Sequence, residues 1–423
     1  MNIRLGGTNY KSLTVMVVDN GLGVELARLL VKDFKKVLYF CEWKQGGFPL
    51  MNQYYIGKGI PGVISVEDMF EFVDETDLFI FTDILQGDLQ KYLEFKGKLV
   101  YGSRNGEILE MNRIKLKETL TQIGLPVGPH QNIQGLENLR LYLKSHPKQW
   151  IKINTFRGTT ETFFAENAEL IEPYLVDLEN KIGPLKDVLF FIVEDELPKA
   201  IELGIDTYTV DGLIPKYVMS GIEVKNKCYL SKINEYNKLP KELTIVNNKL
   251  APIFKQYGYK GWFSTEVRIT EDYTPYLIDA TCRSPWPPSN LIWLQYKNLA
   301  DIYYQTASGV LVEPVYTEEY GCELEICSKW SKTNWTEITF PPQFRDNVKL
   351  YSLTMINNRY WIVPGFDVVG SVVATGKSLE EAIARCKYIA EQVKGIDIEI
   401  HDYTIEKALK HIEDLNKLGL NIY

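Results

Sequence analysis

The chain has 423 residues, of which 45% are hydrophobic and 24% charged, and its formal net charge is −8. This composition is ordinary for a globular protein and argues against disordered, collagen-like and coiled-coil classes, while the length predicts about three domains. An acidic balance without a long basic run argues against direct binding of nucleic acid or of an anionic membrane and favours small-molecule partners.

Targeting and cysteine patterns limit the function further. The chain has no basic-then-apolar leader and no apolar run of ~20 residues, so we expect a cytoplasmic protein that does not cross a membrane. Its six cysteines lack C-x-x-C spacing, which argues against a zinc site or a disulfide framework. The four histidines lie away from any nucleophile signature, so a histidine-based hydrolase is disfavoured. We interpret His411 as a solvated helix residue.

The N-terminal segment, residues 1–108, predicts a Rossmann-like α/β domain. The expected elements are strand 13–18, helix 23–34, strand 37–42, strand 77–84 and strand 98–103. The turn from Asn20 to Gly23 supplies glycines at a helix N-terminus that could take up a phosphate or a carboxylate. Leu26, however, stands where a dinucleotide-binding fingerprint has its third glycine, so a simple tight turn remains an equal alternative.

The middle of the chain alternates cationic and acidic sites. A helix expected over 106–124 carries Arg113 and Lys117 four residues apart on one face, a spacing that a solvated basic stripe would also show. A strand containing Lys152 follows it, and then a loop with Arg157. The next strand ends in the acidic stretch "VEDEL", residues 193–197, which could also be a surface strand end.

Residues 261–288 predict a β-hairpin whose two strands are joined by the polar residues 271–274. If the turn is centred between Asp272 and Tyr273, Glu266 faces Asp279 directly. Like charges at that spacing destabilise a sheet. A magnesium ion would compensate, because magnesium is commonly held by one or two carboxylates plus substrate phosphates. A one-residue slip of the register, or a neighbouring Lys or Arg, would also remove the conflict.

The chain changes character from about residue 311, where several short strands precede a helix expected over 378–394. Ser378 and Glu381 at the start of that helix form a capping box. We expect a small mixed domain over 311–423.

The order of these motifs resembles the ATP-grasp superfamily, and within it the phosphoribosylamine-glycine ligase family. The resemblance covers nearly the whole chain and rests on "GSRNGEILEMNRIKLKETLTQIGLPVGP", "IKIN", "VEDEL", the hairpin and "GSVVATGKSLEEAIARCKYI". It implies an α/β fold that is α+β in its central part. The implied domains are a Rossmann-like domain over 1–108, an ATP-grasp domain over 109–310 with a lid of about 122–195, and a C-terminal domain over 311–423.

The resemblance also implies an activity, an ADP-forming carboxylate-amine ligation that uses ATP and Mg²⁺, with Mn²⁺ as a possible substitute. A substrate carboxylate attacks the γ-phosphoryl group, and an amine then captures the acylphosphate, so positioning and charge neutralisation matter more than a protein nucleophile. Glycine or another amino acid, a nucleotide-like amine and a purine-biosynthesis-like role would follow, in a monomer or homodimer. The alternatives are a carboxylase that uses bicarbonate and a nucleotide-binding scaffold with a decayed site.

The same resemblance assigns roles to individual residues. For ATP, it implies phosphate contacts from Arg113 and Lys152, a closing loop Thr155–Thr160 with Arg157, adenine contacts from the backbone of Asp195 and Leu197, and ribose contacts from Glu194 or Glu202. For the reaction, it implies Glu266, Asp279 and Thr281 as metal ligands, and Arg283 with Lys152 as catalytic residues. Two positions depart from the family, because Asp279 stands where it has Glu and Thr281 where it has Asn.

The departures are larger where that family recognises its substrates. This chain has "GLGVELA", "VMSGIEVKNK" and "RSPWPPSN" in place of the family motifs, so we do not expect the phosphoribosylamine and glycine pair to be retained. The stretch "SPWPPSNLIW" predicts a more apolar acceptor pocket, although Trp286 and Trp293 would also suit a core.

Overall fold

The computed structural model describes residues 9–41, 50–155, 162–197 and 199–423. The N-terminal part is a parallel five-stranded sheet in the order β3-β2-β1-β4-β5, which confirms the predicted α/β class. Its elements are β1 (Thr14–Asp19), α1 (Val24–Leu30), β2 (Lys36–Cys41), β3 (Val63–Val66), β4 (Leu78–Phe81), α2 (Gly87–Phe95) and β5 (Leu99–Tyr101). The central strand β1 is buried along its whole length, as expected for a parallel strand covered on both faces.

The turn after β1 differs in one respect from the expected anion site. The Asp19 carboxylate accepts a hydrogen bond from the Gly21 amide at 2.7 Å, and the Asn20 side chain accepts one from the Leu22 amide at 3.4 Å. Asp19 is only 4% exposed and also accepts from Thr82 at 2.8 Å. The acceptors of these two backbone amides are therefore side chains of the turn itself, a carboxylate for Gly21 and an amide oxygen for Leu22.

A nine-stranded sheet forms the centre of the molecule in the order β14-β13-β10-β11-β12-β15-β20-β17, with β21 also paired to β15. Its strands are β10 (Ile201–Val210), β11 (Tyr217–Val224), β12 (Cys228–Glu235), β13 (Lys260–Ile269), β14 (Pro275–Thr281), β15 (Tyr320–Ser328), β17 (Val348–Leu350), β20 (Val368–Gly376) and β21 (Ile398–Ile400). Because β12 pairs with β15, this sheet continues across residue 311, where the sequence suggests a domain boundary.

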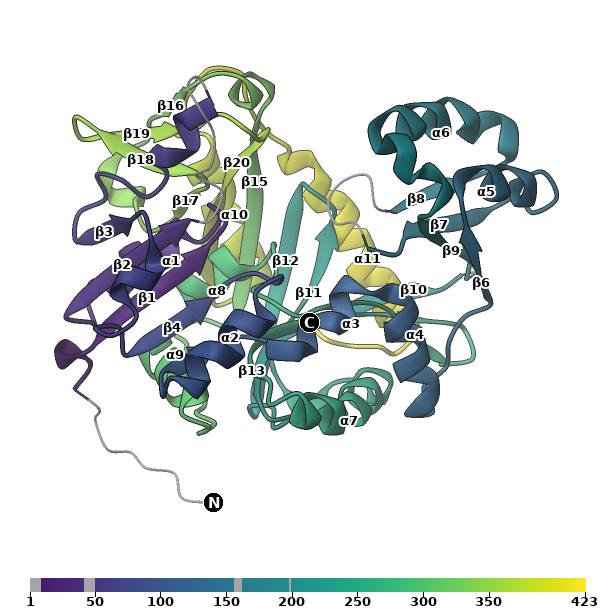
Figure 1. Cartoon of the computed structure of the whole chain (residues 1–423), viewed down its shortest axis with the longest axis horizontal. Helices are drawn as coiled ribbons and strands as arrows, with labels where there is room; N and C mark the ends of the chain where they lie inside the picture. The colour runs from purple at the N-terminus through teal and green to yellow at the C-terminus, as the bar shows by residue number, and fades with distance from the viewer. Residues whose placement is uncertain (1–8, 42–49, 156–161, 198) are drawn as a thin grey trace.

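Helices and a small sheet complete the main body (Figure 1). They are α3 (Ile108–Met111), α4 (Arg113–Gln122), α7 (Lys241–Gln256), α8 (Ser289–Gln295), α9 (Leu299–Ala307), α10 (Leu379–Ala390), α11 (Ile405–Lys417), and the strands β16 (Thr336–Ile338), β18 (Leu353–Ile356) and β19 (Arg359–Ile362). The single helix expected over 106–124 is divided at Asn112, whose side chain caps α4 by accepting from the Lys115 amide at 2.9 Å. Ser378 caps α10 as predicted.

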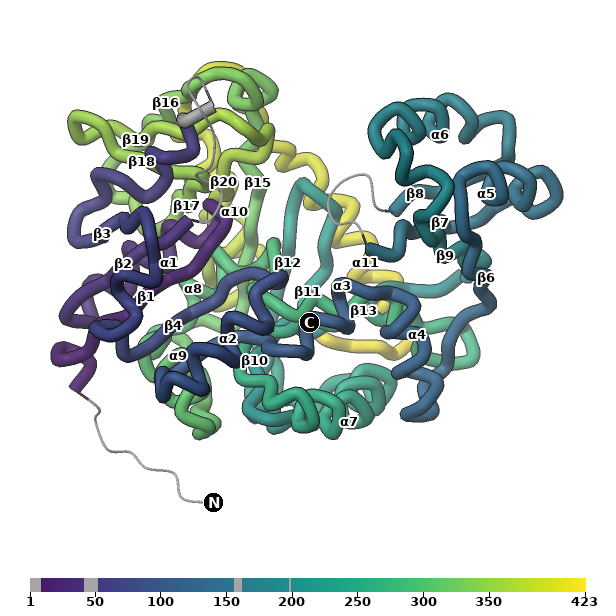
Figure 2. The backbone as a smooth tube through the Cα atoms, in the orientation of Figure 1, coloured from purple at the N-terminus to yellow at the C-terminus, as the bar shows by residue number. Residues whose placement is uncertain are grey.

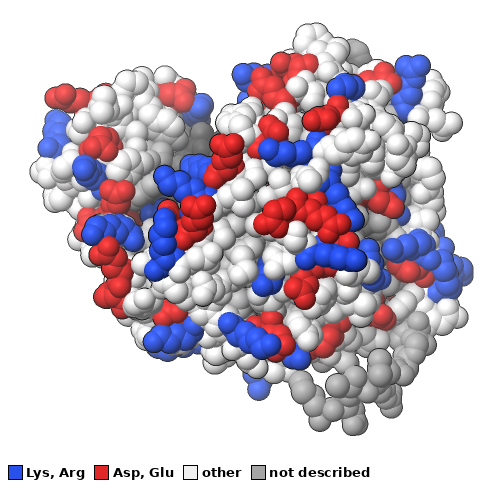
Figure 3. Space-filling view, turned by 180° about the vertical axis from the view of Figure 1, so that it is seen from behind, with Lys and Arg blue, Asp and Glu red and all other residues white. Residues whose placement is uncertain are grey.

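The segment between α4 and β10 forms a separate lobe, which we call the lid. It contains β6 (His130–Gln134), α5 (Leu136–Leu143), β7 (Gln149–Ile153), β8 (Thr162–Ala165), α6 (Ala168–Ile182) and β9 (Phe190–Asp195). Its buried side chains form a core of their own, whereas the rest of the described chain has one large core that extends from Val15 to Ile422 and a smaller one around Met16 and Val18 of the N-terminal sheet. Figure 3 shows the notch between the lid and the main body, with acidic and basic side chains along it.

The last residues of the chain return to the central sheet (Figure 2). The Tyr423 hydroxyl donates to the Leu230 carbonyl at 2.5 Å, and the Asn234 side chain donates to the Ile422 carbonyl at 3.0 Å. None of the helices in the described part of the chain has the length and apolar character needed to cross a membrane.

A buried carboxylate connects the N-terminal and C-terminal parts. Glu25 on α1 is fully buried, and its two oxygens are bound by Arg28 at 2.8 Å and by Arg345 at 2.7 Å. Burial raises the pKa of Glu25, but the charges of Arg345 and Arg28 outweigh that effect and the net pKa is lowered. The carboxylate therefore stays charged and depends on both arginines.

We expect Arg345→Met to destabilise the protein by about 2 kcal/mol, because one oxygen of the buried Glu25 loses its charged partner. The midpoint of thermal unfolding should fall by a few degrees. Arg359→Met is the matched control, since Arg359 is 64% exposed and lies 3.5 Å from Glu337, and it should change stability by less than about 0.5 kcal/mol. Equal shifts in the two variants would contradict this account.

Candidate active site

The hairpin β13–β14 brings Glu266 directly opposite Asp279, which confirms the predicted pairing. The strand register that produces this pairing differs from the expected one. Near the turn, Ile269 faces Pro275 and Val267 faces Leu277, so the turn is centred on Asp272. A β-bulge between Glu266 and Val267 then shifts the register by one residue. Without the bulge, Ile278 would face Glu266.

Two glycines hollow out the sheet next to this pair. Gly204 on β10 lies opposite Glu266, and Gly221 on β11 lies opposite Gly204, so the row Gly221, Gly204, Glu266, Asp279 crosses the sheet on one face. A Cβ at Gly221 would lie 2.3 Å from the Tyr229 ring. The result is a pocket of about 320 Å³ that also includes Thr281 and Arg283 in its lining.

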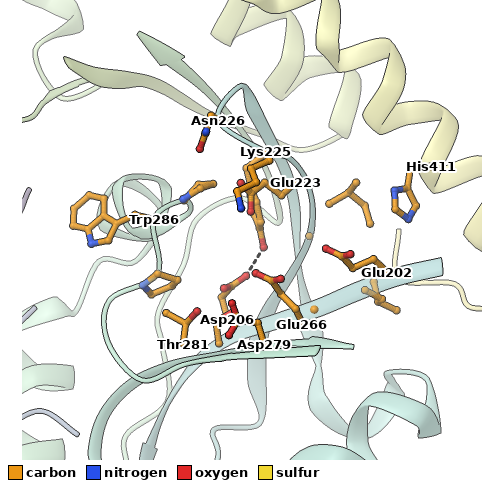
Figure 4. Close-up of a pocket in the computed structure, with 18 of the residues that line it drawn as sticks. Glu202, Asp206, Glu223, Lys225, Asn226, Glu266, Asp279, Thr281, Trp286 and His411 are labelled. Atoms are coloured by element: carbon orange, nitrogen blue, oxygen red, sulfur yellow. Dashed lines mark hydrogen bonds between the residues drawn. The ribbon is translucent and has the colours of Figure 1, made fainter. Parts of the chain in front are cut away.

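The pocket is acidic (Figure 4). Asp206, Glu266, Asp279 and Thr281 gather at one end, with Glu202 and His411 on one side and Trp286 on the other. Burial raises the pKa of Glu266 well above its usual range, and the charges of Asp279, Glu202 and Glu223 raise it further. Burial also raises the pKa of Asp206 to about 6, although Tyr229 donates to its carboxylate.

The cations of the main body do not neutralise the opposed pair. Arg283 donates to Glu110 at 2.9 Å and lies 3.3 Å from Asp83, so two other carboxylates hold its guanidinium. Among the described residues, no Lys or Arg forms an ion pair with Glu266 or Asp279. Of the alternatives left open by the sequence, the register slip is excluded; the charge of the neighbouring Lys152 lowers the pKa of Glu266 but does not outweigh the effects that raise it.

A second group of charges lies at the edge of the lid. The Lys152 ammonium donates to the Ile278 carbonyl at 2.8 Å and lies 3.1 Å from Glu194, which also pairs with Lys117. Burial raises the pKa of Glu194, but Lys152 and Lys117 outweigh it and lower the pKa to about 2. Since Ile278 precedes Asp279, Lys152 connects the lid to the bulged strand beside the acidic pair.

The interpretation of Arg113 and Lys117 as a solvated stripe is wrong. Arg113 is 4% exposed and donates to the Ile153 carbonyl at 3.1 Å. The Lys117 side chain is 13% exposed and faces Glu194. Sequence spacing could not reveal that Lys117 lies close to Lys152, because the two lysines come from different elements.

The remaining predicted ATP residues lie along the junction of lid and body. Asp195 ends β9, and its amide donates to the Pro129 carbonyl at 3.2 Å. Leu197 follows in the connection to β10, where Glu202 lines the pocket and receives a hydrogen bond from Arg268 at 3.2 Å. Arg157 and most of the loop Thr155–Thr160 lie outside the described residues.

Three pocket residues were missed from the sequence. His411 on α11 is half-buried beside Glu202, and burial lowers its pKa, so it is not a solvated helix residue. Asp206 and Glu223 also line the pocket. The alternation Glu202, Gly204, Asp206 on β10 was a usable signal, since residues two apart in a strand share a face.

The comparison with solved structures confirms the resemblance in fold that the motif order predicted. The crystal structure of phosphoribosylamine-glycine ligase from Thermotoga maritima matches with a TM-score of 0.71, at 15% identity over 92% of this chain and 99% of that chain. The biotin carboxylase domain of 2-oxoglutarate carboxylase from Hydrogenobacter thermophilus matches with a TM-score of 0.68, at 12% identity over 99% of this chain and 100% of that chain.

N5-carboxyaminoimidazole ribonucleotide synthetase from Thermotoga maritima matches with a TM-score of 0.59, at 13% identity over 91% of this chain and 99% of that chain. No protein-family model and no curated protein matches this chain by sequence. At these identities the likeness establishes the shared fold.

We expect the ion pairs of Glu194 with Lys117 and Lys152 to stabilise the fold at neutral pH and to lose this effect in acid. Because the pKa of Glu194 is lowered from 4.5 to about 2, its contribution is present above pH 4.5 and is lost as the pH falls toward 2. Glu194→Gln should therefore be less stable than the native protein at pH 7, by an amount of order 3 kcal/mol.

Thermal unfolding of the two proteins between pH 7 and pH 3 measures this difference, which should shrink below pH 4.5. Glu172→Gln is the control, because Glu172 is 46% exposed in its pair with Arg140 and should show a small difference at every pH. A stability gap for Glu194→Gln that does not change with pH would contradict the proposed pairing.

Proposed function

We propose that this protein is an ATP-dependent, ADP-forming carboxylate-amine ligase that works through an acylphosphate. The observation that carries the proposal is the opposed pair Glu266 and Asp279, which shares an acidic pocket with Arg283 and lies beside Lys152 at the edge of the lid. The solved structures that share this fold include a ligase and carboxylases, which supports the class.

The residues present fit a divalent cation of the magnesium type. No three His, Cys, Asp or Glu side chains in the described chain are grouped so that they could hold a metal by themselves. Magnesium does not require such a group, because one or two carboxylates and the substrate phosphates suffice. Glu266 and Asp279 would hold the ion, with the Thr281 hydroxyl beside them. The bound ion supplies charge neutralisation for the transferring phosphoryl group.

The cations at the lid edge would bind the ATP phosphates. Lys152 and Lys117 converge on Glu194, so their ammonium groups are already fixed close together before nucleotide binds. Arg113 lies against the same lid strand through the Ile153 carbonyl and supports this arrangement. Fixed cations cost little reorganisation when charge develops, which favours phosphoryl transfer.

The junction between lid and body would hold the nucleoside. Asp195 and Leu197 form the connection from β9 toward β10, where backbone groups suit an adenine edge, and Glu202 or Glu194 could accept from ribose hydroxyls. Arg157 would complete the phosphate contacts from its loop. We also propose a cytoplasmic protein, monomeric or homodimeric, with magnesium or manganese as the metal.

In the reaction, a substrate carboxylate would attack the γ-phosphoryl group near the acidic pair. Arg283, held in place by Glu110 and Asp83, would stabilise the charge of the acylphosphate while an amine displaces phosphate. Glycine or another amino acid, with a nucleotide-like amine as in purine biosynthesis, is our first choice of substrates.

A second candidate is a carboxylase in which bicarbonate is the phosphorylated acid. The biotin carboxylase domain that shares the fold was solved with MgADP and bicarbonate, which favours this candidate over others. Formation of ADP that depends on bicarbonate, without an added amino acid, would identify it.

We expect Glu266→Gln to lower ADP release by about 100-fold or more, since one of the two opposed carboxylates is lost. The melting temperature should stay nearly unchanged, because removing one of two like charges does not strain the sheet. The assay is ADP release over amino acids crossed with amines, together with bicarbonate.

Glu271→Gln is the matched control, because Glu271 lies at the turn of the same hairpin and is 61% exposed in its pair with Lys199. It should keep full activity. Full activity in Glu266→Gln would remove the metal assignment, and native protein that binds ATP without turnover on any pair would indicate a decayed site.

We expect Lys117→Met to weaken MgATP binding by about tenfold or more, since a hydrogen bond to a charged group is worth ~1.5–3 kcal/mol. Lys115→Met on the same helix is the control, because Lys115 is 42% exposed and pairs with Glu118. Isothermal titration calorimetry measures both. Unchanged affinity in Lys117→Met would exclude a phosphate contact from Lys117.

A further inference from the structure

A second and larger cavity, of about 690 Å³, adjoins the acidic pocket. It lies between the turn after β1, the loop joining β11 and β12, and the C-terminal segment around β15. Asn226 and Trp286 line both cavities, so the two spaces meet at these residues. A molecule in the second cavity would therefore adjoin the pocket that contains the acidic pair.

One buried acid in this cavity has no hydrogen-bonding partner. Glu325 on β15 is 8% exposed, and its Oε2 atom is buried without a hydrogen bond among the described residues. Burial, with the nearby Glu323 adding to it and Lys227 opposing it, raises the pKa of Glu325 to about 7. A buried carboxylate without a partner is costly, and a cationic ligand would remove that cost.

A second acid in the same cavity is already satisfied. Asp367 forms an ion pair with Lys332 at 2.9 Å, and its pKa is lowered by that lysine despite burial. Among the acids of the described lining, Glu325 is therefore the one whose missing partner a ligand would supply.

The walls of the cavity are aromatic. Trp286 and Tyr351 meet edge to face with ring centroids 5.4 Å apart, and Phe366 is 61% exposed at the cavity. Trp286 is only half-buried, whereas Trp293 lies in the core at 3% exposure. Exposed aromatic faces next to a carboxylate suit a flat ligand with a positive charge.

The cavity is poorly equipped for a phosphate group. Lys227 is the only cation among its described lining residues. The nearby turn after β1 offers no vacant amides at Gly21 and Leu22, because the Asp19 and Asn20 side chains bind them. A phosphate here would also face the acids Glu325 and Asp367.

We propose that this cavity binds the acceptor substrate, and that the acceptor is an unphosphorylated aromatic amine whose ring lies against Trp286 and Phe366 and whose cationic group pairs with Glu325. The ligand is a substrate only if the proposed ligase function holds. The inference restricts the acceptor from the nucleotide-like amines to amines without a phosphate group.

The test compares three probes by isothermal titration calorimetry on the full chain. Tryptamine carries the ring and the ammonium group, tryptophol carries the same ring with a neutral hydroxyl, and ribose 5-phosphate carries the phosphate. We expect tryptamine to bind about tenfold more tightly than tryptophol, because of the charged pair with Glu325, and ribose 5-phosphate not to bind.

Three variants assign the effect to residues. Glu325→Gln should bind tryptamine and tryptophol equally, whereas Asp367→Asn, which removes an acid that Lys332 already pairs, should keep the preference. Phe366→Ser should weaken both indoles, and it changes an exposed side chain, so the fold should tolerate it. A tryptamine preference that survives in Glu325→Gln, or ribose 5-phosphate that binds more tightly than tryptamine, would overturn the proposal.

The tryptamine-binding test and the ADP-release test can fail independently of each other. Glu266→Gln should bind tryptamine as the native protein does, because its change lies in the other cavity. Normal ADP release with no preference for tryptamine would overturn the cavity assignment alone. Tryptamine binding at Glu325 with no ADP release from any pair would leave the cavity in place and overturn the ligase.

Discussion

The arrangement of the candidate site depends on one constraint, the close approach of the Glu266 and Asp279 carboxylates. The bulge in β14 places Asp279 opposite Glu266, and the glycines of β10 and β11 open the sheet beside them. The neighbouring cations are held by other acids, Arg283 by Glu110 and Lys152 by Glu194, and neither forms an ion pair with Glu266 or Asp279. The sheet thus tolerates repulsion between the two acids, and under the proposed function a bound cation would relieve it.

The bulge also connects the two lobes. The irregular strand turns Asp279 toward the pocket, and the carbonyl of the preceding residue, Ile278, accepts a hydrogen bond from Lys152 of the lid. Through Glu194 that lysine is tied to Lys117 on α4, at the base of the lid. Asp279 and the two lysines therefore share one local support.

Local patterns predicted the local structure well. Four of the five strands of the first domain, the cap at Ser378 and the facing of Glu266 and Asp279 follow from local residue patterns over a few positions, whereas the short strand β3 was missed. That last pairing was correct because two deviations cancelled, a turn centred on Asp272 and a bulge beyond it, and neither has a clear mark in the sequence. The break at Asn112 was missed because a capping asparagine within a helical pattern resembles a tolerated polar residue. Lys117 and His411 join the site through packing between distant segments, which no local pattern encodes.

The return of the chain end to the central sheet has a consequence for biosynthesis. His411 on α11 lines the acidic pocket, and Tyr423 and Ile422 are hydrogen-bonded to β12. A ribosome releases residues in order, and the lid, which has a core of its own, can fold while the remainder is still being made. The pocket lining is completed only after α11 has been synthesised, so a chain truncated before His411 would lack that side chain from the pocket.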